Sequence, residues 1–185
     1  MLADDRNANM ALSRYTADRT AEPTLDMVAT RIKELVPGMD EDSLYSASRK
    51  VLSREKARRD ALQRERDDQA SIAYGSLRSG NGFDSLPMGA VQNLKRSTVK
   101  SLQDYASRKA AGALVTNSAL YWDLISNEDK LKNMTDEDFV ALAPELTDGD
   151  FDDLMNFRQG IKTGKFKNTQ GDSLRRNIKD AFARN

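Results

Sequence analysis

The longest uninterrupted helix signal in this sequence lies between residues 40 and 74, where neither glycine nor proline occurs. Asp40 is placed as a helix N-cap, and the residues after it are rich in types that favour helix over strand. From Arg54 to Asp68, 11 of 15 residues are charged, so this part has no continuous apolar face. Such a helix bridges modules or lies against a partner chain, with most of its charged surface in solvent.

Apolar side chains form a stripe near the start of this helix. We expect them, together with one leucine from the charged middle, to contact a partner or a second copy: Leu44, Tyr45, Val51, Leu52 and Leu62. In the middle, Glu55–Arg59 and Asp60–Arg64 are opposite charges four residues apart, and each pair stabilises a helix by about 0.2–0.5 kcal/mol. The acids in this stretch interrupt any basic stripe, which disfavours nucleic acid binding along it.

A shorter helix is predicted before the long one. Thr24 is placed as its N-cap, and apolar residues follow at helical spacing: Leu25, Val28, Ile32 and Leu35. Pro37 and Gly38 end this helix. Residues 1–23 contain few apolar side chains, so we expect a weakly docked arm that becomes helical against a partner.

The clearest break in the chain is Ser79-Gly80-Asn81-Gly82, and we place a domain boundary there. Residues 1–79 are predicted to hold the arm and the long charged helix, which together form the assembly region. Residues 80–185 are predicted to form a compact bundle of short helices around Trp122, because large aromatic rings contribute most where they are buried. The whole chain is therefore predicted to be all-α.

Turn and cap signals divide the second domain into helices. The first helix is predicted to start at Ser85, with Pro87 in its first turn, and to end at Gly112. Asn117 is predicted to cap a short apolar helix. A last helix is expected over about 170–182, where apolar residues recur four apart.

A short pattern occurs twice in the same domain, as Met134-Thr135-Asp136-Glu137-Asp138-Phe139 and as Leu146-Thr147-Asp148-Gly149-Asp150-Phe151. In each copy Thr is placed as N-cap, acids lie in the first turn and Phe begins the buried face, which predicts helices over 135–143 and 147–162. These acids do not form a calcium loop, because the positions that need Gly and Glu hold Asp153 and Gln159.

The chain contains neither histidine nor cysteine, which excludes zinc fingers, disulfide frameworks, cysteine nucleophiles and Ser–His–Asp triads. No phosphate-binding glycine loop occurs, so no cofactor is expected. Lys plus Arg number 29, as do Asp plus Glu, and this balance argues against binding nucleic acid or anionic membrane over the whole surface. We predict that the chain is not an enzyme, with a carboxylate-based hydrolase as the catalytic alternative.

Charge is uneven along the second half of the chain. Residues 126–157 carry ten acids and two lysines, whereas residues 158–185 carry eight basic residues and two acids. The basic segment either folds back along the acidic helices, which we prefer, or binds phosphate or a partner. Its side chains available for such binding are Lys162, Lys165, Lys167, Arg175, Arg176 and Lys179. No leader peptide and no apolar run long enough to cross a bilayer is visible, so no integral membrane segment is expected.

Three groups of residues follow one another between positions 84 and 159. They are Asp84-Ser85-Leu86-Pro87 with Leu94, Leu102, Tyr105 and Gly112; then Asn117 with Leu120-Tyr121-Trp122-Asp123-Leu124; then Phe139, Leu142, Leu146-Thr147-Asp148, Phe151, Leu154 and Gln159. This order resembles a helical segment of tailed-bacteriophage virion proteins, namely the large internal, DNA-ejection and tail-associated proteins. The resemblance implies either a separate small virion protein or a part of a larger one, and it carries over no catalytic residue.

The resemblance implies a structural protein that is made in the host bacterial cytoplasm and located in the virion. Its partners would be other virion proteins or further copies of itself, with transient DNA contact during ejection. A helical adaptor or effector that binds a cellular protein is the alternative from another class. An exposed apolar stripe over 41–77 would favour the structural role, whereas a deep pocket with converging acids would favour an enzyme.

Overall fold

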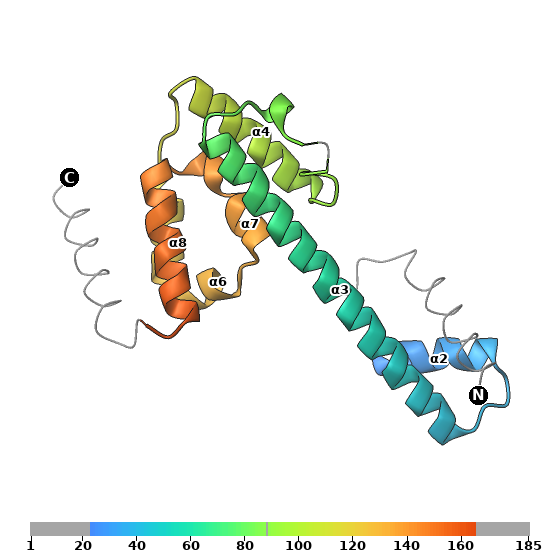
Figure 1. The fold of residues 1–185 in the computed structure, drawn as a ribbon. Helices are drawn as coiled ribbons and strands as arrows, with labels where there is room; N and C mark the ends of the chain where they lie inside the picture. Colours follow the sequence, from blue (N-terminus) through green and yellow to red (C-terminus); the bar gives the residue numbers. More distant parts are fainter. Residues whose placement is uncertain (1–22, 88, 166–185) are drawn as a thin grey trace. The chain divides into compact units, whose positions relative to one another are not determined.

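The computed structural model describes residues 23–87 and 89–165 (Figure 1). All regular elements in these residues are helices and no strand occurs among them, so the predicted all-α fold is confirmed. The elements are α2 (Leu25–Leu35), α3 (Glu41–Arg78), η1 (Phe83–Ser85), α4 (Arg96–Ala110), α5 (Ser118–Ser126), α6 (Glu128–Asn133), α7 (Asp136–Val140), η2 (Ala143–Glu145) and α8 (Asp148–Lys162). The predicted arm, apart from Pro23, and the predicted last helix lie outside the described residues.

Side-chain caps define the starts of α2 and α3, as predicted. The Thr24 hydroxyl accepts a hydrogen bond from the Met27 amide at 3.3 Å, and the Asp40 carboxylate accepts one from the Ser43 amide at 2.9 Å. These bonds satisfy amides that have no partner within their own helix. Between the two helices Gly38 has a φ of 97°, a conformation that glycine adopts without steric cost.

α3 is a single helix of 38 residues that ends at the predicted break. Gly80 has a φ of 95°, and the Asn81 amide donates to the Ser76 carbonyl at 3.3 Å, which closes the helix. The chain nevertheless groups into two compact units, Met1–Gln63 and Arg64–Asn185, so the division falls inside α3 and not at the predicted boundary between residues 79 and 80. The reason is that the last turns of α3 belong to the core of the second unit, through Ala70, Ala73, Tyr74 and Leu77.

In the first unit, α2 lies against the N-terminal part of α3 (Figure 1). The apolar side chains buried between them are Val28, Ile32, Leu44 and Val51. Ser48 is buried on the same face of α3, and its hydroxyl donates to the Leu44 carbonyl at 2.8 Å. Residues 44, 48 and 51 are three or four apart, so one face of α3 is covered by α2.

Four aromatic rings occupy the centre of the second unit, and each comes from a different helix. Tyr74 of α3 lies 4.4 Å from Phe151 of α8 and 5.1 Å from Tyr105 of α4, measured between ring centroids. Phe139 of α7 lies 4.7 Å from Phe151. These tilted contacts join α3, α4, α7 and α8 into one core.

The prediction of a helix start at Ser85 is wrong. Ser85 ends the short η1, and the Pro87 carbonyl then accepts a hydrogen bond from the Ala90 amide at 2.8 Å, which turns the chain. The long helix begins only at Arg96. Pro87 fits the first turn of a helix and also fits a β-turn, and Gly89 two residues later favours the turn.

The prediction that Trp122 lies at the centre of the core is also wrong, because its side chain is 37% exposed. α5 is apolar around most of its circumference, and only one face can meet the core. That face carries Tyr121, Leu124 and Ile125. The short helix α6 that follows was not predicted, although Asn127 caps it through a hydrogen bond from the Lys130 amide at 3.1 Å.

The repeated Thr–acid–Phe pattern begins two helices, as predicted. The Thr135 and Thr147 hydroxyls accept hydrogen bonds from the amides three residues later, at 3.1 and 3.3 Å. α7 ends at Val140, earlier than expected, and the turn η2 separates it from α8. Phe139 and Phe151 are both buried, so the pattern correctly marks the first core residue of each helix.

Candidate functional site

A shallow groove lies between α2 and the start of α3 in the first unit. Its volume is about 440 Å³, and its lining combines an apolar floor with a charged and polar rim. The floor is formed by Ala29, Met39, Leu44 and Tyr45, and the rim by Asp26, Thr30, Lys33 and Glu41. Tyr45 is 41% exposed although its ring is apolar. The groove therefore combines apolar surface, including part of the Tyr45 ring, with charged side chains at its edge.

The structure places the predicted partner-contact residues in different environments. Leu44 and Val51 are buried against α2, so most of their surface is already used within the chain. Leu52 and Leu62 are half-buried, and Tyr45 is exposed. A role of these residues in binding a partner stays a prediction, and Tyr45 is the one with most surface to offer.

The charged middle of α3 contains one carboxylate that is not solvated. The Glu55 side chain is buried, although the sequence here is almost entirely charged. Its oxygens accept hydrogen bonds from Arg58 at 3.0 Å and from Arg59 at 2.9 Å. The bond from Arg58, which is the larger effect, and the bond from Arg59 hold the pKa of Glu55 below its usual range despite burial. A second hollow of about 380 Å³ lies beside it, lined by Pro23, Leu52, Glu55, Lys56, Arg59 and Asp60.

A polar network lies at the edge of the aromatic core in the second unit. The Tyr105 hydroxyl donates to Asp148 at 2.7 Å, and the Lys109 ammonium donates to the other oxygen of Asp148 at 2.5 Å. Burial acts to raise the pKa of Asp148, but these two bonds outweigh it and lower the pKa. Burial, and then the bond to Asp148, raises the pKa of Tyr105. Tyr105 is therefore held as a neutral donor and Asp148 as an ion.

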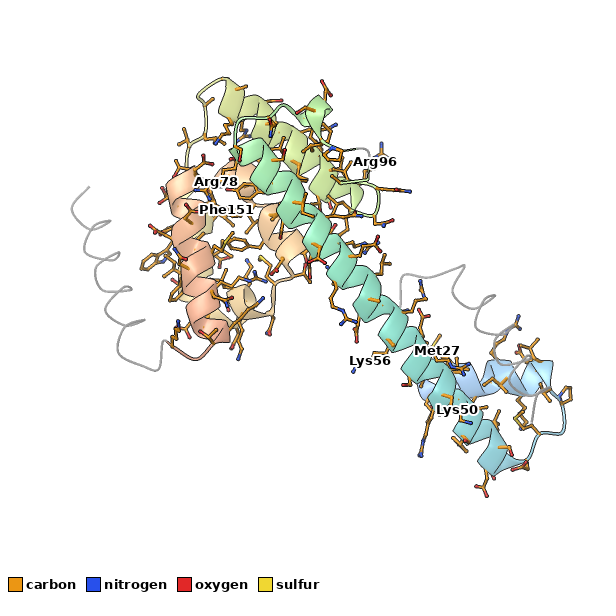
Figure 2. The ribbon with its side chains drawn as sticks, viewed as in Figure 1. Met27, Lys50, Lys56, Arg78, Arg96 and Phe151 are labelled. Carbon is orange, nitrogen blue, oxygen red and sulfur yellow. The ribbon has the colours of Figure 1, made fainter. Side chains whose placement is uncertain are left out.

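The hydroxyl of Tyr74 differs from that of the neighbouring Tyr105 in its hydrogen bonding. It is buried and forms no hydrogen bond within the described residues. Burial raises the pKa of Tyr74 to about 12, and the positive charge of Arg78 offsets part of this effect. Arg78 itself forms a two-pronged ion pair with Asp152 of α8, and Figure 2 shows Arg78 and Phe151 where α3 and α8 meet.

Several acids of α7, η2 and α8 pair with bases on α3, on α4 and at Lys95, just before α4. Lys95 pairs with Asp138 at 2.6 Å, and Arg108 lies 3.7 Å from Glu145. Burial acts to raise the pKa of Asp138, and the hydrogen bonds from Lys95 and Thr135 lower it below its usual value. Much of the excess negative charge seen in the sequence is thus balanced within the second unit.

The basic residues predicted to bind phosphate or a partner are only partly described. Lys162 lies 3.6 Å from Asp136, which Arg158 also binds at 2.6 Å. Lys165 is exposed. The others, Lys167, Arg175, Arg176 and Lys179, lie outside the described residues. Phosphate or partner binding by this set stays a prediction.

Sequence reasoning missed the most buried carboxylate of the second unit. Glu137 of α7 is fully buried, and its Oε1 accepts hydrogen bonds from the Lys95 amide at 2.6 Å and the Thr98 hydroxyl at 3.1 Å. It therefore caps the N-terminus of α4 from another helix. The Glu137 amide in turn donates to Asp67 of α3 at 2.8 Å. The only sequence signal was the capped start of α7, which does not reveal a partner 42 residues away.

The polar groups of the second unit bind one another and join its helices. A neutral Tyr105 and an ionised Asp148 bind each other and join two helices, and neither has a pKa shifted in the direction that activates a nucleophile or a general base. Within residues 23–87 and 89–165, no cluster of three or more acidic side chains is arranged to hold a metal ion. In the same residues no helix is both long and apolar enough to span a membrane.

Comparison with family models, with curated proteins and with solved structures gives no significant match to this chain.

Proposed function

We propose that this chain is a non-enzymatic structural protein of a bacteriophage virion, an internal, ejection or tail-associated component that assembles through helix–helix contacts. The observation that carries the assembly role is the groove between α2 and α3, with its apolar floor and the exposed ring of Tyr45. Apolar surface that is open to solvent and rimmed by polar side chains is the kind of surface that an assembly covers.

The virion setting is supported by the sequence resemblance over residues 84–159. Residues that carry it, among them Leu102, Tyr105, Phe139 and Phe151, lie in the core of the second unit. Ion pairs between helices and the buried cap from Glu137 hold this core together, which suits a structural component. A packed core in one unit and an open groove in the other suit an assembly protein.

The experiment that tests this role is the protein content of virus particles. Particles are purified from the virus, or from the induced bacterium, whose genome encodes the chain, and their proteins are identified by mass spectrometry. Peptides of this chain at several copies per particle, resistant to a salt wash, are expected. Absence of the chain from intact particles, with the chain abundant in the lysate, contradicts the proposal. Any assembly role of the chain would then have to lie outside the virion.

A further inference from the structure

We propose that the groove between α2 and α3 binds the same groove of a second copy of this chain, so that two α2–α3 pairs form a four-helix contact. This inference rests on the proposed assembly role and adds the identity of the partner. The starting observation is how little the two helices bury. The described part of the first unit contains four buried apolar side chains, Val28, Ile32, Leu44 and Val51.

Two helices alone provide one line of contact, whereas a bundle of four encloses a core. The buried face of α3 in the first unit follows residues 44, 48, 51 and 55, which covers only the side toward α2. Tyr45 and Met39 lie at the flank of this face and line the groove. A second pair of helices placed over the groove would cover the ring of Tyr45 and extend the core on the open side.

The charges on the rim favour a second copy as the occupant. The rim carries two acids, Asp26 and Glu41, and one base, Lys33. All three are exposed, and none of them forms an ion pair with another described residue. In a two-fold contact each copy presents the same surface, so a contact of Lys33 with an acid of the other copy would form twice by symmetry. A surface that carries both signs is complementary to itself, whereas a strongly charged partner would require one sign.

The first test compares matched substitutions on α3 by analytical ultracentrifugation of the full chain. The unchanged protein is expected to form dimers in a concentration-dependent equilibrium. Tyr45→Asp places a charge in the apolar floor and is expected to weaken dimerisation by about tenfold or more in Kd. Ile72→Asp is the control, because Ile72 is 61% exposed on the same helix, outside the groove and in the second unit. Circular dichroism checks that each variant keeps its helix content.

The second test exchanges the rim charges. Lys33→Glu makes the rim wholly acidic and is expected to weaken dimerisation, whereas the double variant Lys33→Glu, Glu41→Lys is expected to restore it. Restoration by the exchanged pair is the result expected when the two residues meet across copies. A monomer at every concentration overturns the inference, and so does equal weakening by Tyr45→Asp and Ile72→Asp.

The remaining outcomes show what fills the groove, and they distinguish the dimer inference from the proposed virion role. If residues 1–22 of the same chain fill the groove, the protein is monomeric and Tyr45→Asp lowers its thermal stability without changing its mass, which overturns the inference. A monomer that is nevertheless found in virus particles contradicts the dimer and keeps the virion role. A dimer that is absent from particles keeps the inference about the groove and contradicts the virion role.

Discussion

Tyr74 and Tyr105 have rings 5.1 Å apart, but their hydroxyl groups contribute differently to stability. The Tyr105 hydroxyl donates to an ionised carboxylate, that of Asp148, whereas the Tyr74 hydroxyl is buried without a hydrogen bond in the described residues. A hydrogen bond to a charged group is worth more than one between neutral groups, and an unsatisfied buried hydroxyl is a cost. The two tyrosines are therefore a matched pair for a test at the residue scale.

Tyr105→Phe is expected to lower the free energy of unfolding by about 1.5–3 kcal/mol, because Asp148 loses one of its two charge-stabilising donors. Tyr74→Phe removes a hydroxyl that has no partner, so it is expected to leave stability unchanged or slightly higher. Urea denaturation followed by circular dichroism measures both. Equal destabilisation by the two substitutions would mean that the bond to Asp148 carries no special weight.

At the scale of single elements, the start of α4 depends on a residue of another helix. Lys95 precedes α4 and its own side chain caps nothing, but its amide donates to the buried carboxylate of Glu137. The amide of Glu137 donates to Asp67 in its turn. A residue of α3 thus caps α7, and a residue of α7 caps α4.

Glu137→Gln keeps the shape of the side chain and removes its charge, so α4 would lose a charged cap and Lys95 a nearby counterion. Hydrogen bonds to a charged group are worth about 1.5–3 kcal/mol and neutral ones about 0.5–1.5 kcal/mol, so exchanging the carboxylate for an amide that keeps an acceptor oxygen is expected to cost about 1–2 kcal/mol. Hydrogen exchange is expected to show faster exchange in the first turn of α4, from the Lys95 amide onward. The exposed Asp104→Asn, in the middle of α4, is the control, and it is expected to change neither quantity. Unchanged protection at Lys95 would show that Glu137 is not the cap.

Local signals predicted most helix boundaries because each such signal acts within a few residues. Thr24, Asp40, Asn117 and Thr147 cap the helices that follow them, and each accepts a bond from an amide three residues away. Gly112 ends α4 with a left-handed φ of 64°, also as predicted. These features need no knowledge of the tertiary fold.

The features that were missed depend on contacts between distant residues. The start of α4 is capped by Glu137, 42 residues away from Lys95, and the turn from Pro87 to Ala90 separates this start from Ser85. Trp122 is on the flank of α5 because the core meets the neighbouring face, and no pattern in an almost wholly apolar helix selects that face. The groove in the first unit was equally invisible, since its lining joins residues of α2 to residues of α3. The sequence pointed to Tyr45 but not to the rim around it.

At the scale of the whole molecule, the equal numbers of acids and bases are accompanied by many specific pairs in the second unit. Acids on α7, η2 and α8 bind bases on α3, on α4 and just before α4, as in Asp138–Lys95, Asp148–Lys109 and Asp152–Arg78. One consequence of these pairs concerns the pKa values of the three aspartates. The pKa values of Asp138, Asp148 and Asp152 are all lowered by their cationic partners, although burial opposes the shift. Stability should therefore depend on pH in the acid range.

The direction of that dependence follows from proton linkage. A carboxylate with a lowered pKa in the folded state contributes stability above its unfolded pKa, about 3.9 for aspartate, and loses it as the pH falls toward the folded value. The free energy of unfolding is expected to be nearly constant between about pH 5 and 7 and to fall below about pH 4, where the unfolded chain binds more protons.

Asp148→Asn removes one of these titrating groups, so the variant should be less stable at neutral pH and lose less stability on acidification. Asp153→Asn is the matched control on the same helix, because Asp153 is exposed and forms no ion pair within the described residues. Urea denaturation at a series of pH values measures the slope for all three proteins. If Asp148→Asn keeps the slope of the unchanged protein, the Tyr105–Lys109 pair does not hold Asp148 ionised, and the acid sensitivity must come from the other pairs that bind α7 and α8 to α3 and α4.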